Sequence, residues 1–84
     1  MSVHKDITTH VNKQNKRITD FVALDRKREL YIEDAVELCK QGKNFSTDKI
    51  NAVTNTINEL AKQGIVPSRK NVTAEMVREY VRKL

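Results

Sequence analysis

Residues 45–66, FSTDKINAVTNTINELAKQGIV, contain both a start signal and a stop signal for a helix. Ser46 stands where an N-cap accepts a hydrogen bond from the first helical turn, and Phe45 and Ile50 flank it as a hydrophobic staple. Gly64 provides the left-handed residue that commonly ends a helix. One apolar stripe connects the two signals: Ile50, Val53, Ile57, Leu60 and Ala61. The stretch therefore predicts an amphipathic helix from Ser46 to Gly64.

The end of the chain repeats this pattern. Thr73 stands at a second N-cap position, and Val72 and Val77 flank it as a staple. Pro67 disfavours helical geometry at Val66, so a short loop separates the two helices. The second half of the chain is therefore predicted to be a helix pair whose second member runs from Thr73 to the C-terminus.

The first half of the chain predicts one long helix. Residues 3–41 contain neither glycine nor proline, and Gly42 follows as a stop signal. At about 100° per residue, the apolar residues stay within about 50° of one line. They are Val3, Ile7, Val11, Ile18, Phe21, Val22, Ile32, Val36 and Cys39. This phase continues through the charged run 25–29, which favours an unbroken helix of about 55 Å.

These elements predict an all-α fold in a single domain spanning residues 1–84. We expect a three- or four-helix bundle with a long N-terminal helix and a C-terminal helix pair. The four-helix version requires the first helix to bend at residues 25–29 and fold back on itself.

The composition limits the class of protein. The 84 residues include a single cysteine, which excludes an intramolecular disulfide and fits a reducing compartment. No apolar run approaches the roughly 20 residues that cross a membrane, and the first residues lack the apolar stretch of a signal peptide. We therefore expect a cytoplasmic protein without a membrane partner.

The net charge of +5 is distributed unevenly along the chain. Residues 1–17 carry four basic residues and one acidic residue, and residues 67–84 carry five basic and two acidic residues. Residues 18–42 carry four basic and six acidic residues. Two basic ends and an acidic middle favour self-association, or an acidic partner, at least as much as nucleic acid.

No pattern of side chains predicts an enzyme, a metal site or a cofactor. His4 and His10 are the only histidines, and neither belongs to a cluster of metal-ligating residues. Cys39 lies among apolar residues on the predicted core face, which is typical of a structural thiol. The two glycines, Gly42 and Gly64, stand apart at predicted helix ends and form no phosphate-binding loop.

An acidic cluster in the first helix has two interpretations. Glu29, Glu33 and Glu37 are spaced by four residues and share one helix face, with Asp34 beside them. The simpler interpretation is a solvated face that nearby basic residues partly neutralise. The alternative is a docking patch for a basic surface, including the basic end of a second copy.

The predicted helix lengths favour a non-enzymatic protein–protein interaction module. Helices of about 25 Å and about 18 Å cannot cover the apolar line of a helix of about 55 Å. A second copy is the simplest partner for the uncovered part, and an unknown protein partner is the other possibility. The residues predicted to mediate self-association are Ile7, Val11, Ile18 and Phe21.

The alternative function is nucleic-acid binding. The stretch GIVPSR, residues 64–69, resembles the entry to a helix-turn-helix, which would place the last helix in the major groove. The contact residues on that hypothesis are Arg69, Lys70, Arg78 and Arg82. Glu75 and Glu79 argue against it, because they interleave with the cations on the exposed face and would lie close to phosphates.

Two stretches carry a resemblance to a known family. KRELYIEDAVELCKQGKNFSTDKIN, residues 27–51, and LAKQGIVPSRKNVTAEMVREYV, residues 60–81, together span about half of the chain. In both stretches the chain resembles the YpbS-like family of short, uncharacterised Firmicutes proteins. The resemblance implies a cytoplasmic bacterial protein without an assigned activity, and it implies no site residues.

Overall fold

The computed structural model describes residues 2–84, with side chains described from Asn15 onward. Within this range it contains three helices and no strand: α1 (Ser2–Lys40), α2 (Asp48–Ala61) and α3 (Ala74–Arg82). The prediction of an all-α fold is confirmed. α1 is a single helix through residues 25–29, so the four-helix alternative is wrong.

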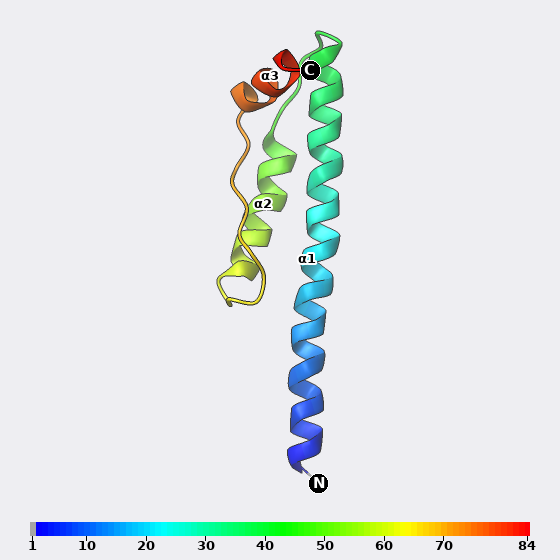
Figure 1. Ribbon diagram of the computed structural model, residues 1–84, viewed down its shortest axis with the longest axis vertical. Helices are drawn as coiled ribbons and strands as arrows, with labels where there is room; N and C mark the ends of the chain where they lie inside the picture. Colours follow the sequence, from blue (N-terminus) through cyan, green and yellow to red (C-terminus); the bar gives the residue numbers. More distant parts are fainter. Residues whose placement is uncertain (1) are drawn as a thin grey trace.

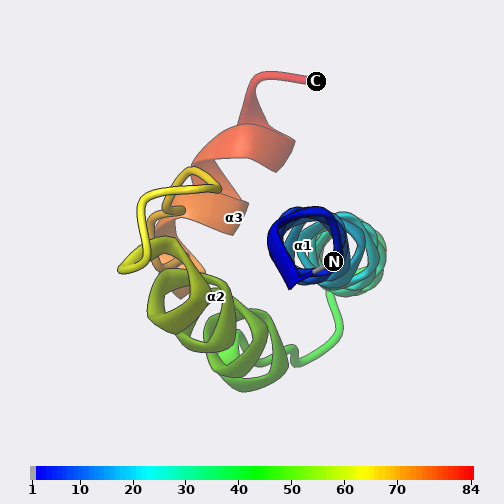
Figure 2. The same ribbon diagram turned by 90° about the horizontal axis from the view of Figure 1, so that it is seen from below.

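The three helices form an elongated molecule that measures 62 × 20 × 17 Å. Figure 1 shows α2 and α3 beside the C-terminal half of α1, while the N-terminal half runs on past the end of α2. Viewed along α1, both short helices lie on one side of it (Figure 2). Among the described residues they pack against α1 rather than against each other. The three described helices therefore form a long helix with two short helices on one flank, rather than clearly the predicted three- or four-helix bundle.

α1 ends at the predicted glycine. Gly42 has a φ of +71°, in the left-handed region that favours glycine. Its N–H donates to the carbonyl of Cys39 at 3.1 Å, and the N–H of Lys43 donates to the carbonyl of Leu38 at 2.9 Å. These two bonds form a Schellman motif, which satisfies carbonyls that the helix end leaves open.

α2 starts one residue later than the sequence predicts. The N-cap residue is Thr47 rather than Ser46, and the hydroxyl of Ser46 accepts from the N–H of Asp48 at 3.1 Å. Ser46 therefore still satisfies a free N–H of the first turn, but from one position further out. At the other end, Gly64 has a φ of +79° and its N–H donates to the carbonyl of Ala61 at 2.9 Å.

α3 begins as predicted. Thr73 is the N-cap residue, and its hydroxyl accepts from the N–H of Met76 at 3.1 Å. Val72 and Val77, the predicted staple pair, are both buried in the main core cluster. The same cluster includes Ala35 of α1 and Ile50 of α2, so the core joins all three helices at the C-terminal end of α1.

The half-buried Cys39 packs against this core, on the face where the sequence places it.

No described helix is both long enough and apolar enough to cross a membrane.

Candidate functional site

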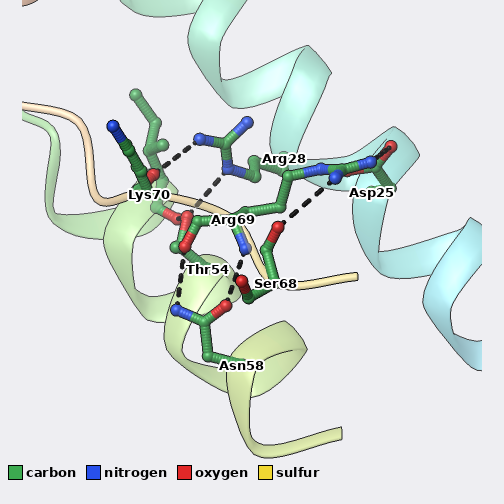
Figure 3. A network of polar contacts seen from close by, with 8 residues as sticks. Asp25, Arg28, Thr54, Asn58, Ser68, Arg69 and Lys70 are labelled. Atoms are coloured by element: carbon green, nitrogen blue, oxygen red, sulfur yellow. Dashed lines mark hydrogen bonds and ion pairs between the residues drawn. The ribbon is translucent and has the colours of Figure 1, made fainter. Parts of the chain in front are cut away.

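A polar network joins α1, α2 and the loop before α3 (Figure 3). The guanidinium of Arg69 donates from Nε to Oδ1 of Asp25 at 3.0 Å and from Nη2 to Oδ2 at 3.4 Å. It also lies over the ring of Phe21, 5.2 Å from the ring centre. Because both side chains are at least two-thirds buried, this two-point ion pair is stronger than an exposed one.

Arg28 makes the second connection in the network. Its Nε donates to Oγ1 of Thr54 at 2.8 Å, and its Nη2 donates to the carbonyl of Lys70 at 2.8 Å. Thr54 is fully buried in α2, and its hydroxyl donates to the carbonyl of Ile50 at 2.9 Å. A single α1 side chain therefore holds both α2 and the loop.

Two asparagines of α2 hold the loop before α3 in an extended form. Asn58 accepts from the N–H of Arg69 at 2.8 Å and donates to the carbonyl of the same residue at 2.9 Å. Asn51 makes the same pair of bonds to Val72, at 2.7 Å and 2.9 Å. The seven-residue step from Asn51 to Asn58 in the helix is about 10.5 Å long, and the three-residue step from Arg69 to Val72 in extended chain is about 10 Å long. Both asparagines can therefore bond their partners at the same time. We call residues 68–73 the clamped segment.

On the N-terminal side of the network, α1 passes from a covered part to a bare part. Asp25 lies seven residues after Ile18 and seven before Ile32, so these residues share one line on the helix. Ile32 packs against the core. Ile18 is 46% exposed and Val22 is 49% exposed. We call residues 2–19 the α1 arm; no other described element lies beside it in Figure 1.

The residues predicted to mediate self-association therefore fall into three groups. Ile18 lies exposed on the α1 arm, and Val22 extends the same apolar face. Phe21 is half-buried under Arg69 and belongs to the polar network. The side chains of Ile7 and Val11 lie outside the described residues.

The four residues predicted to contact nucleic acid are spread over two elements. Arg69 is paired with Asp25, as described above, and the side chain of Lys70 is exposed. On α3, the guanidinium of Arg78 lies 3.3 Å from Glu75 and that of Arg82 lies 2.9 Å from Glu79. These α3 pairs have the three-residue spacing expected of a solvated helix.

A groove runs between α1 and α3 beyond the core. It has a volume of about 220 Å³ and an apolar lining: Ile32, Val36, Val72, Met76, Val77 and Tyr80. We call this hollow the α1/α3 groove. Glu33, Glu37 and Lys40 of α1 border it beside Tyr80. From Asn15 onward, no group of three or more His, Cys, Asp or Glu side chains has the geometry to hold a metal ion.

Sequence reasoning missed the polar network. In the sequence Asp25 and Arg28 belong to a charged run, although their spacing from Ile18 and Phe21 places them on the apolar line. That seven-residue spacing was the available signal. The roles of Asn51 and Asn58 had a weaker signal, since two exposed-looking amides two turns apart are common on any helix.

The comparisons with known proteins cover nearly the whole chain. Residues 1–83 match the model of a family described as "Protein of unknown function (DUF2533)". The chain belongs to this family. It is 49% identical to "Uncharacterized protein YpbS" of Bacillus subtilis (strain 168), over 98% of this chain and 96% of that protein. The resemblance to the YpbS-like family is thereby confirmed, and the relative is bacterial. No solved structure matches the chain.

Proposed function

We propose that this protein is a non-enzymatic helical interaction module that self-associates through the bare apolar face of α1. The observation that carries the proposal is the exposure of Ile18 and Val22, at 46% and 49%, on a helix that continues past its neighbours. Ile7 and Val11 share the phase of this face in the sequence. We call the face formed by these four residues the α1 stripe.

Helix energetics support the proposal. Most helices in proteins are stabilised by packing of an apolar face, and no other described element lies beside the α1 arm. Burying a valine or isoleucine side chain contributes about 1.5–3 kcal/mol relative to leaving it exposed. A second copy that covers the α1 stripe therefore stabilises the α1 arm as well as the assembly.

Nucleic-acid binding is the second candidate, and the net charge of +5 is the observation in its favour. The arrangement of the cations weakens it. Arg69 is held by Asp25, and the α3 arginines lie beside Glu75 and Glu79. A phosphate would have to compete with these carboxylates, or accept them as close neighbours.

Sedimentation equilibrium of three proteins tests the proposal. The wild type should show a mass that rises from 9.7 kDa toward twice that value with concentration. Ile18→Glu places a charge on the α1 stripe and should shift the association to at least about tenfold higher concentration. Leu30→Glu is the matched control, because Leu30 is 54% exposed on α1 but lies off the stripe. A monomeric wild type at high micromolar concentration would rule the proposal out.

A further inference from the structure

The α1 stripe lies on the same side of α1 as the α1/α3 groove, with the exposed Glu29 between Val22 and Val36. At about 100° per residue, Ile18, Val22 and Val36 lie within about 40° of one another around α1, although they span five turns. Val36 forms part of the groove lining. One straight side of α1 thus carries an exposed apolar stretch near its N-terminus and an apolar hollow near its C-terminus.

The groove has the apolar character of a docking site. Met76 and Tyr80 of α3 are 49% and 57% exposed, so two large side chains of the groove wall are in contact with water. Ile32 and Val36 of α1 are half-buried beneath them. An apolar side chain placed between the two helices would remove both walls from water.

Charge distinguishes the groove from the arm. Glu29, Glu33 and Glu37 are exposed on α1, and two of them border the groove. In the sequence, residues 1–17 carry four basic residues and one acidic residue. With Glu33, Glu37 and Lys40, the α1 border of the groove is net acidic, which is complementary to the basic α1 arm.

We propose that the α1/α3 groove of one copy receives the α1 arm of a second copy, and that the exchange is reciprocal. This inference rests on the proposed self-association and names the surface that the arm occupies. A two-fold axis perpendicular to α1 beside Ala23 and Leu24 brings residues 7–18 of each copy opposite residues 29–40 of the other. Both stretches are about 18 Å long, and a two-fold interface needs one face that holds both complementary parts.

Electrostatics favours this arrangement over pairing of the two arms with each other. Arm-to-arm pairing places two basic segments side by side and leaves the groove open to water. Arm-to-groove pairing places each basic segment against Glu29, Glu33 and Glu37, and it covers Met76 and Tyr80 as well. Like charges at close range repel and opposite charges attract, so these three glutamates favour the second arrangement.

Mixing two impaired variants tests the inference. Ile18→Glu damages the arm and leaves the groove intact, whereas Tyr80→Glu damages the groove wall and leaves the arm intact. Each variant alone should remain monomeric where the wild type is dimeric. An equimolar mixture should recover a heterodimer, because the intact arm of one variant fits the intact groove of the other. Circular dichroism confirms that both variants fold, and Leu30→Glu again serves as the control.

Glu33→Lys tests the attraction between the basic α1 arm and the acidic border of the groove. The site is exposed, so the substitution leaves the core intact. Dimerisation of the wild type should weaken as salt rises, and Glu33→Lys should raise the dimer dissociation constant by about tenfold and flatten that dependence. If Tyr80→Glu and Glu33→Lys dimerise like the wild type while Ile18→Glu does not, the groove is not the site, and the proposed self-association still stands. If the wild type is a monomer, both proposals fail.

Discussion

The carboxylate of Asp25 and the guanidinium of Arg69 lie 3.0 Å apart although 44 residues separate them in the chain. This pair fastens the clamped segment to the middle of α1. It lies in the part of α1 that α2 covers, six residues from the α1 arm. The network around it thus ties α1, α2 and the clamped segment together close to the proposed interface.

Asp25→Ala should lower the free energy of unfolding by about 2 kcal/mol, because it leaves the partly buried guanidinium of Arg69 without its charged acceptor. Urea unfolding followed by circular dichroism measures the change. Asp20→Ala is the control, since the pair of Asp20 with Lys16 is exposed and its atoms are 3.9 Å apart. That substitution should cost less than about 1 kcal/mol. Equal effects of the two substitutions would contradict the role of the Asp25–Arg69 pair.

Asn51→Ala and Asn58→Ala should each destabilise the fold by about 2 kcal/mol, because each leaves a backbone N–H and a carbonyl of the clamped segment without partners. Asn55→Ala changes an exposed amide of the same helix and should have little effect. Chemical denaturation of the three variants side by side provides the comparison. If Asn55→Ala is destabilised, or Asn58→Ala is unaffected, the hydrogen bonds of the two asparagines do not hold the clamped segment.

Gly64→Ala should destabilise the protein by about 1 kcal/mol, because alanine is strained at a φ of +79°. Space is not the cause, since a Cβ at this position would meet no atom within 4 Å. Gly64→Asn should recover part of the loss, because asparagine tolerates the left-handed region better than alanine. Thermal unfolding of the two variants measures the difference, and an alanine variant as stable as the wild type would argue that the turn has another conformation.

The helix ends were predictable because their causes are local. A glycine that must adopt a positive φ, or a threonine that caps the third N–H after it, acts within five residues of the chain. Gly42, Gly64 and Thr73 all lie where their sequence neighbours place them. Ser46 was misplaced by one residue because Thr47 beside it fits the same position, and local chemistry does not separate the two.

The polar network was not predictable in the same way. The pairing of Asp25 with Arg69 depends on how the chain returns along α1, and no local pattern encodes that path. The sequence indicates only that Asp25 and Arg28 interrupt an apolar line. A charged residue on such a line requires a partner of opposite charge or a route to water, and the fold decides which one it has.

Nucleic-acid binding can be separated from self-association by a salt titration. With Arg69, Arg78 and Arg82 beside carboxylates, we expect no measurable binding of generic duplex DNA or RNA at about 50 mM salt. Fluorescence anisotropy with labelled duplexes makes the measurement. Nucleic-acid binding would be favoured over self-association if the protein binds tightly and the affinity falls steeply with salt. Lys70→Ala should then weaken binding uniformly across sequences.

Hydrogen exchange at two protein concentrations tests the central claim most directly, because it locates the interface as well as detecting it. If the α1 stripe mediates self-association, amides of residues 2–19 should exchange more slowly at high than at low micromolar concentration. Amides of α2, which lies off the proposed interface, should exchange at the same rate in both samples. Exchange in residues 2–19 that does not change with concentration, in a range where the mass of the protein doubles, would contradict the account.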